Sequence, residues 1–201
     1  MADRAISSRS PLAALATPGR RGAAMPDPGV RIREVTDFAA IGLTARRGKI
    51  GAVTAVLSRH LGSPVADGAR RTSGGALAIA GTAPGQWLAV GRGRGAAAQL
   101  AAVRADLAGL AAVTDQGDGR VILDVAGPRA RDALAKGIAI DLDAIAFHVG
   151  DTAQTIVAHI GLQIALIDAA PTFELISARS TAESLWSWLV ASAAEYGIEV
   201  H

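Results

Sequence analysis

The stretch Ala-Pro-Gly-Gln-Trp-Leu-Ala-Val at residues 83–90 returns at residues 170–177 as Ala-Pro-Thr-Phe-Glu-Leu-Ile-Ser, an offset of 87 residues. Each copy is followed by an arginine, Arg92 or Arg179, and then by a segment with helical periodicity. Upstream of each copy the pattern predicts a strand, a helix and another strand. The chain therefore contains two copies of one supersecondary unit.

This repeat predicts an α+β fold with two similar β-α-β-β-α-β-like (ferredoxin-like) repeats side by side and an extended N-terminal arm. Right-handed crossovers would place both helices of a repeat on one face of an open sheet. The predicted domains are an arm over residues 1–29, a basic first repeat over 30–116 and an acidic second repeat over 117–201.

The periodicity of apolar residues locates the individual elements. Helices are predicted at about 49–61, 96–108, 128–137 and 180–196, the last opening on a capping box of Ser180 and Glu183 and ending at Gly197. Strands are predicted at about 30–35, 41–45, 76–80, 86–90, 111–114, 120–125, 153–160, 162–167 and 173–177.

The first 29 residues hold four of the eight prolines and show no periodicity. Such a segment buries too little apolar area to offset its chain entropy, so we expect it to be disordered unless bound to a partner. Its apolar residues Leu12, Leu15 and Met25 would then lie in a partner's groove. In the last helix, Trp188 points off the apolar face. These four residues are the predicted subunit contacts.

Composition excludes several classes of protein. The 201 residues contain no cysteine, which rules out disulfides, thiolate metal sites and a cysteine nucleophile. No apolar run approaches the ~18–20 residues of a membrane span, and no export signal is present, so a cytoplasmic location is expected. The dispersed basic residues and few aromatic residues also argue against a nucleic-acid partner.

The net charge of +2 conceals a division along the chain. Residues 1–104 carry 15 basic and 5 acidic side chains, a net charge of +10, whereas residues 105–201 carry 5 and 13, a net charge of −8. Two explanations are open, because complementary charges steer association. The halves attract each other, or each faces a different partner surface.

The segment after the first copy of the repeat contains a nucleotide-binding pattern. Gly91 and Gly93 belong to a G-x-G-x-x-A sequence that follows a predicted strand and opens a helix, and Asp115 ends the next predicted strand. These three residues are weak cofactor-binding candidates. The alternative is a glycine-rich turn, because the matching turn of the second repeat has no glycine pair yet connects the same elements.

No residues form a recognisable catalytic or metal-binding set. The four histidines lack metal-ligand spacing, and no serine lies in a nucleophile elbow. Residues 115–120, which include two aspartates and an arginine, are interpreted as an Asp/Gly-rich linker between the repeats.

One set of short motifs extends over nearly the whole chain. It consists of residues 10–12, 84–88, 113–120, 127–137, 140–142, Phe147, Thr155, His159, 172–175, 179–180 and 186–189. In this combination the sequence resembles the gamma subunit of heterotetrameric sarcosine oxidase. The second repeat, in which a Gly-Pro pair opens a helix after an Asp-containing strand, is also similar to the folate-binding aminomethyltransferase superfamily.

The resemblance implies an oxidoreductase that oxidatively demethylates sarcosine to glycine with hydrogen peroxide and passes the one-carbon unit to tetrahydrofolate. It implies that this chain is the accessory gamma subunit, with alpha, beta and delta subunits as partners. FAD, FMN, NAD and tetrahydrofolate are expected in those other subunits, and no catalytic residue, cofactor or metal is assigned to this chain. The family usually has a serine where this chain has Gly117, which removes a hydroxyl that could cap the linker turn.

One alternative function stays open on the residues alone. An independent folate- or nucleotide-binding protein of the aminomethyltransferase-like fold could use the basic first half to hold a polyglutamate tail or a phosphate.

Overall fold

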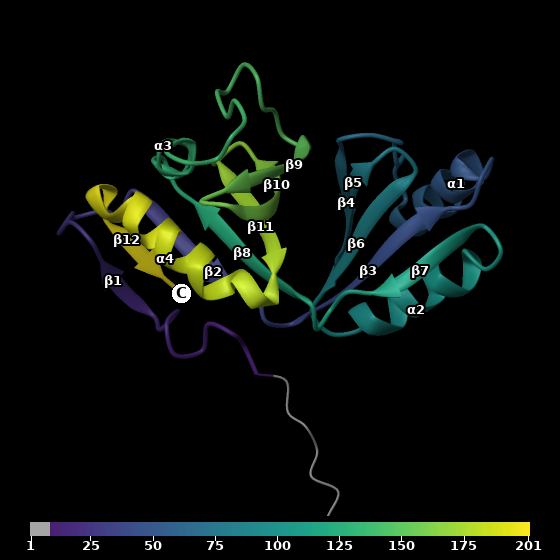
Figure 1. The fold of residues 1–201 in the computed structure, drawn as a ribbon, viewed down its shortest axis with the longest axis horizontal. Helices are drawn as coiled ribbons and strands as arrows, with labels where there is room; N and C mark the ends of the chain where they lie inside the picture. Colours follow the sequence, from purple (N-terminus) through teal and green to yellow (C-terminus); the bar gives the residue numbers. More distant parts are fainter. Residues whose placement is uncertain (1–8) are drawn as a thin grey trace, which may run out of the picture.

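The computed structural model describes residues 9–201, which form two β-sheets with their inner faces turned toward each other (Figure 1). The helices cover the outer faces of the sheets. Residues 1–8 of the predicted arm lie outside the described residues. No helix within residues 9–201 has the length and apolar character needed to cross a membrane.

The first sheet has five strands in the order β4-β5-β6-β3-β7, all antiparallel to their neighbours. On its outer face the helices α1 (Ile50–Leu61) and α2 (Ala96–Asp106) close one apolar core around Trp87. The strands are β3 (Phe38–Ala45), β4 (Arg71–Gly74), β5 (Leu77–Ala83), β6 (Gln86–Arg92) and β7 (Ala111–Asp115).

The second sheet has seven strands in the order β1-β12-β2-β8-β11-β10-β9. The helices α3 (Ala130–Ala135) and α4 (Ala182–Ala193) cover its outer face, and α4 is flanked by the short 3-10 helices η1 (Arg179–Thr181) and η2 (Ala194–Tyr196). The strands are β1 (Gly19–Arg21), β2 (Val30–Glu34), β8 (Arg120–Ala126), β9 (Thr152–Val157), β10 (Ile160–Asp168), β11 (Thr172–Ala178) and β12 (Ile198–Val200).

The two halves repeat one topology, which confirms the predicted α+β class with two similar units. The order β3-α1-β4-β5-β6-α2-β7 corresponds to β8-α3-β9-β10-β11-α4-β12. Each unit is one strand longer than the expected β-α-β-β-α-β pattern. Sequence reasoning missed β4 because its residues are Arg-Thr-Ser-Gly, without apolar alternation, and missed β12 because it is three residues long.

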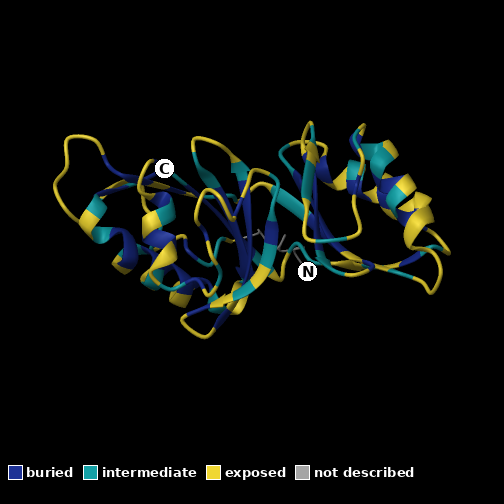
Figure 2. Cartoon of the chain, turned by 90° about the horizontal axis from the view of Figure 1, so that it is seen from above, coloured by how far each residue is buried: buried dark blue, intermediate teal, exposed yellow. Residues whose placement is uncertain are grey.

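Alternation along the strands gives each sheet two different faces. In β3, Ile41 and Leu43 face the helices, whereas Ala40 packs toward the other sheet. The same division applies to the seven-stranded sheet, where Leu175 of β11 faces the helices and Ile176 faces inward. Figure 2 shows the buried residues concentrated between each sheet and its helices and between the two sheets.

Most predicted helix ends agree with the structure. At the end of α1, Gly62 adopts a φ of 71° and its backbone N–H donates to the Ser58 carbonyl, which is the chemistry expected of a glycine stop. The prediction of a capping box at Ser180 was wrong, because η1 begins at Arg179 and includes Ser180, and α4 begins at Ala182 without a side-chain cap. The hydroxyl of Thr181 instead donates to the Ala178 carbonyl.

Residues 9–29 of the N-terminal arm pack on their own chain, which differs from the expectation that the arm requires a partner. Leu12 is fully buried in the core of the seven-stranded sheet, and Leu15 packs against the same core. Strand β1 of the arm pairs with β12 at the edge of that sheet. Strand β12 supplies the main-chain partners of β1, and the core of the seven-stranded sheet takes up the apolar side chains of the arm.

Residues 30–34 belong to the second unit, so the predicted start of the first repeat at residue 30 was wrong. Strand β2 lies between β8 and β12, antiparallel to the first and parallel to the second. Val30 and Ile32 are fully buried in the core of the seven-stranded sheet. The period-2 pattern correctly identified a strand, but it carries no information about which sheet the strand joins.

The inner faces of the sheets meet at a small apolar cluster. It consists of Ala40, Leu88 and Val90 from the five-stranded sheet with Ile122 and Ile176 from the seven-stranded sheet. Main-chain hydrogen bonds add a second contact at the edge strands: the Arg71 N–H donates to Gly150 and the Thr152 N–H donates to Ala69. These contacts fix one sheet relative to the other.

Next to this cluster, buried ion pairs connect the sheets. Asp124 and Glu174 lie directly opposite each other on β8 and β11 and are 7% and 2% exposed. The Arg92 guanidinium from the five-stranded sheet donates to both Asp124 oxygens at 2.8 Å and also to Glu174. Arg71 donates to Glu174 at 2.9 Å, and Arg33 of β2 donates to Asp124 at 2.6 Å.

Neighbouring carboxylates on adjacent strands repel each other, so this arrangement depends on the arginines. Burial alone would raise the pKa of Asp124, but hydrogen bonds and Coulomb attraction from Arg92 and Arg33 hold it below its ordinary value. Burial would likewise lower the pKa of Arg92, but its hydrogen bonds to Asp124 and the charge of Glu174 raise it. Basic residues of the first half thus neutralise acidic residues of the second half, which supports mutual attraction as the meaning of the charge division.

The burial of Leu12 leads to a prediction about stability. Leu12→Ala is expected to lower the free energy of unfolding by about 2–5 kcal/mol, because it leaves a cavity in a closed core. Met25→Ala, at an arm residue that is 45% exposed, is the control and should change it by less than about 0.5 kcal/mol. Urea denaturation followed by circular dichroism measures both, and equal effects would contradict the packing of the arm.

The buried ion pairs predict an acid-sensitive stability. Because the folded-state pKa of Asp124 is depressed, the ionised carboxylate contributes fully to stability at pH values above its ordinary pKa of 3.8. This contribution is lost as the pH falls below 3.8. Asp124→Asn should lower the unfolding free energy at pH 7 by about 3–5 kcal/mol, since it leaves buried charge incompletely paired. Between pH 5 and pH 3, the free energy of unfolding of this variant should also decrease less than that of the wild-type chain.

Asp106→Asn is the matched control for this change. Asp106 pairs with Arg59 and His60 at the surface, where such pairs contribute about 0.2–1 kcal/mol. Urea denaturation of both variants at pH 7, 5 and 3 makes the comparison. If the unfolding free energy of the Asp124→Asn variant depended on pH as strongly as that of the wild type, this carboxylate would not be the cause of the acid sensitivity.

Candidate functional site

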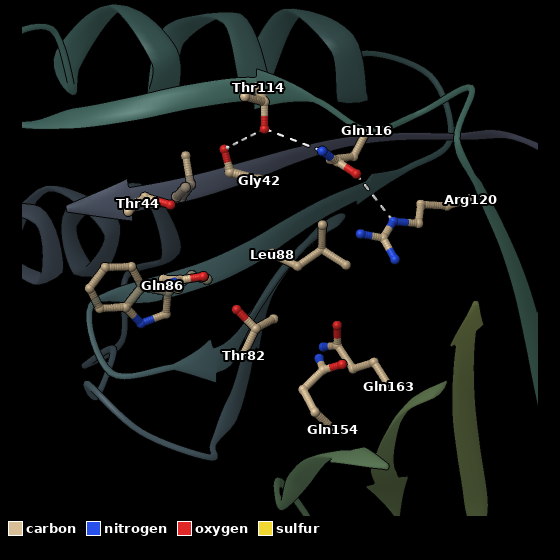
Figure 3. A pocket seen from close by; sticks show the side chains of 12 residues that line it. Gly42, Thr44, Thr82, Gln86, Leu88, Thr114, Gln116, Arg120, Gln154 and Gln163 are labelled. Atoms are coloured by element: carbon tan, nitrogen blue, oxygen red, sulfur yellow. Dashed lines mark hydrogen bonds between the residues drawn. The ribbon is translucent and has the colours of Figure 1, made fainter. Parts of the chain in front are cut away.

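A cavity of about 390 Å³ opens between the inner faces of the two sheets (Figure 3). Strands β3, β5, β6 and β7 of the five-stranded sheet, the linker residue Gln116, and strands β8, β9 and β10 of the other sheet contribute residues to it. Its lining consists of Gly42, Leu43, Thr44, Thr82, Gln86, Trp87, Leu88, Thr114, Gln116, Arg120, Gln154 and Gln163. This combination of position and polar lining makes it the candidate site.

The wall from the five-stranded sheet is polar because of strand alternation. Leu43 and Trp87 point to the helices, so their neighbours Thr44, Gln86 and Leu88 point to the cavity. Thr114 lies opposite Gly42 across β3 and β7. A Cβ at Gly42 would come within 3.0 Å of the Thr114 hydroxyl, so a larger residue would displace this side chain.

A chain of hydrogen bonds crosses this wall and ends at an arginine. The Thr114 hydroxyl donates to the Gly42 carbonyl at 3.5 Å and accepts from the Gln116 amide nitrogen at 3.2 Å. The Gln116 amide oxygen then accepts from Nε of Arg120 at 3.2 Å. These bonds determine the orientation of the Gln116 amide and hold the Arg120 guanidinium beside the cavity (Figure 3).

The opposite wall presents two glutamines. Gln154 of β9 and Gln163 of β10 are cross-strand partners, and both side chains point toward the five-stranded sheet (Figure 3). Gln154 is exposed, whereas Gln163 is 5% exposed. The Gln163 amide nitrogen is buried and has no hydrogen-bond partner within residues 9–201. A buried donor of this kind carries a desolvation cost until it meets an acceptor.

The chemistry of this lining is recognition by hydrogen bonding. Amides and hydroxyls donate and accept hydrogen bonds but do not exchange protons near neutral pH, and Arg120 stays charged. The described part of the chain also contains no cluster of three histidine, aspartate or glutamate side chains that could hold a metal ion. The cavity is therefore suited to binding polar groups, with one fixed positive charge at its edge.

The glycine candidates for nucleotide binding have structural roles. A Cβ at Gly91 would lie 2.9 Å from that of Ala96, so this glycine permits close packing of β6 against α2. Gly93 has a φ of 75°, and its N–H already donates to the Asp37 carbonyl at 2.9 Å. A pyrophosphate would require that amide.

Asp115 also lacks the expected geometry. In a dinucleotide site the acid ends the strand next to the glycine-bearing strand, but here β3 runs antiparallel between β6 and β7. The Asp115 carboxylate accepts the backbone N–H of Gly117 at 3.0 Å and so supports the turn of the linker. The structure therefore does not bring these three candidates together as a nucleotide site, and the alternative function is not favoured.

The four predicted contact residues lie in different environments. Leu12 is inside the core, and Leu15 is largely covered by it. Trp188 is partly buried and packs closely on the turn that follows α3, since a Cβ at Gly137 would lie 2.8 Å from its indole nitrogen. Met25 is 45% exposed and retains an apolar side chain at the surface.

Sequence reasoning did not identify the cavity residues. The signal was present as threonine and glutamine at alternate strand positions, in Thr44, Gln86, Thr114, Gln154 and Gln163. Polar residues at such positions indicate a strand with one solvent-facing side. They do not indicate that a second sheet lies opposite.

Comparison with solved structures places this fold beside two known proteins. A chain of the heterotetrameric sarcosine oxidase from Corynebacterium sp. U-96 in complex with pyrrole 2-carboxylate is similar with a TM-score of 0.78 and 23% identity, over 94% of this chain and 96% of that chain. The glycine cleavage system aminomethyltransferase T from Bartonella henselae is similar with a TM-score of 0.63 and 16% identity, over 86% of this chain and 47% of that chain.

Sequence comparison identifies the family. A search of curated proteins gave no match. The model of the family described as "Sarcosine oxidase, gamma subunit family" matches residues 48–195, which run from just before α1 into η2 and so cover both repeat units except β3 and β12. The match confirms the resemblance found from the sequence motifs, and the chain belongs to the sarcosine oxidase gamma subunit family.

Proposed function

We propose that this chain is the accessory subunit of a cytoplasmic heterotetrameric sarcosine oxidase, in which it packs against alpha, beta and delta subunits. The observation that carries the proposal is the family match over residues 48–195. The fold, similar to a chain of a heterotetrameric sarcosine oxidase along nearly its whole length, supports it.

In this proposal the complex oxidises sarcosine. The N-methyl carbon loses two electrons to oxygen, which yields hydrogen peroxide, and the one-carbon unit passes to tetrahydrofolate while glycine is released. We assign FAD, FMN, NAD and tetrahydrofolate to the other subunits. The physical support is that the ion pairs and the cavity of this chain offer structural contacts and hydrogen bonding rather than an acid, base or nucleophile placed for reaction.

Met25 is the contact that we retain for another subunit. It is an exposed apolar side chain on the arm, beside a shallow depression bounded by Arg20, Gly22 and Ile198. A flexible thioether adapts well to an irregular partner surface. Leu12 and Leu15 contribute indirectly by fixing the arm to the core, and the partly exposed Trp188 lies on α4.

Co-expression tests the proposed assembly. This chain, carrying an affinity tag and produced with the candidate large flavoprotein subunits, should retain them in a fixed ratio, and the isolated complex should be yellow and form hydrogen peroxide from sarcosine. The chain produced alone should show neither flavin absorbance nor turnover. Sarcosine oxidation by the isolated chain, or its failure to retain any subunit, would refute the proposal.

A substitution at Met25 tests the proposed contact. Met25→Asp should weaken assembly at least about tenfold, because a charge would be buried in an apolar contact. The thermal unfolding temperature of the isolated chain should stay unchanged. Ile50→Asp, at a 38% exposed residue of α1, is the control for adding a charge at an exposed apolar position. Quantitative pull-down measures both, and assembly of the Met25 variant at the wild-type level would rule out this contact.

A further inference from the structure

The inter-sheet cavity has an unused positive charge at its edge. Within residues 9–201, the Arg120 side chain forms one hydrogen bond, from Nε to Gln116, and no carboxylate lies within 4 Å of its guanidinium nitrogens. Asp115 and Asp118 line a separate cavity that Arg120 also lines, but neither pairs with it. The two terminal nitrogens of the guanidinium therefore remain available on the cavity side (Figure 3).

The orientation of Arg120 suits a ligand with two oxygens. Because Gln116 accepts from Nε and is itself held by Thr114, the guanidinium cannot rotate freely. Its terminal nitrogens form the planar fork that binds a carboxylate through two parallel hydrogen bonds. Pre-orientation reduces the entropy that binding must overcome.

Gln163 provides a second and independent indication of a ligand. Its side chain is 95% buried and lines the cavity, and among the described residues its amide nitrogen has neither a partner nor appreciable accessible surface, so the amide must turn to present this nitrogen to a ligand. Most buried donors in folded proteins are hydrogen-bonded, so a turn of this amide onto an acceptor of a ligand would remove the desolvation cost of its nitrogen. Arg120 and Gln163 lie on opposite sides of the same cavity, so one ligand can meet both.

Size and charge narrow the class of ligand. Among residues 9–201, no acidic residue lines the cavity, and the single charged side chain of its lining is that of Arg120. A volume of about 390 Å³ lies within the range of small-molecule sites and exceeds that of a simple inorganic anion. Leu88 offers one apolar contact, while the threonines and glutamines offer hydrogen bonds to the body of the ligand.

We propose that this cavity binds a small organic carboxylate that is free in solution, with Arg120 binding the carboxylate and Gln163 donating to a second acceptor group. The proposal goes beyond the accessory role, because it gives this chain a ligand of its own. A carboxylate from an aspartate or glutamate of another subunit has the same chemistry, and the experiment separates the two sources.

Two probes of nearly equal shape test the charge requirement. N-acetylglycine carries a carboxylate and an amide, and N-acetylglycinamide differs by replacing the carboxylate with a neutral amide. Titration of the full chain, followed by saturation-transfer NMR, should show saturable binding of the first and at least about tenfold weaker binding of the second. Equal binding of the two probes, or binding of neither, would overturn the proposal without any need for a variant.

Substitutions then test the residues. Arg120→Gln should weaken the binding of N-acetylglycine at least about tenfold, and Gln163→Leu should weaken this binding to a smaller extent. Arg94→Gln removes an exposed arginine that does not line the cavity and should leave binding unchanged. Wild-type affinity in the Arg120 variant would overturn the proposed site, and circular dichroism identifies any variant that fails to fold.

The source of the carboxylate is tested in the assembled complex. A free ligand site should still bind N-acetylglycine after the other subunits are present, with the affinity measured for the isolated chain. Loss of probe binding on assembly would mean that an acidic side chain of another subunit fills the cavity, and would overturn the free-ligand proposal. The first titrations use the isolated chain, so their result can be interpreted even if the subunit proposal fails.

Discussion

The whole arrangement depends on the contact of Arg92 with the adjacent carboxylates of Asp124 and Glu174. Two acids facing each other on neighbouring buried strands would repel, and each would lose its hydration on burial. Arg92 from the other sheet and Arg71 and Arg33 compensate both effects. A buried ion pair contributes modestly to net stability, but a buried charge without a partner is costly. Any other relative position of the sheets would separate these arginines from the carboxylates and would therefore be less stable.

This constraint also explains why a polar cavity can exist between the sheets. The ion pairs and the apolar cluster around Leu88 hold the inner faces together at one region, while the edge strands β4 and β9 meet elsewhere through main-chain bonds. Between these contacts the faces carry threonine and glutamine in place of apolar side chains. Such residues do not pack into a dry interface, so space and unpaired donors remain there.

The elements with a strong local signal were predicted well. The repeat at residues 83–90 and 170–177 identified β6 and β11, and the apolar stripe ending at Gly62 identified α1. Errors arose where the signal depends on a distant partner. Strand β4 is polar, and β12 is short and is held by pairing with β1 and β2. The arm resembled a disordered segment because the groove that buries Leu12 is built from residues far away in sequence.

The amino-acid sequence by itself determined the duplicated unit, the helices with their apolar faces, the opposite charges of the two halves and the family. These features are encoded by spacing and composition, which act over a few residues or over the whole chain. Tertiary structure alone decided that β2 joins the second unit, that Arg92 meets Asp124 and Glu174, and that Arg120 and Gln163 share a cavity. Each of these depends on which faces of two sheets come together, and strand alternation defines two faces without specifying what lies opposite either one.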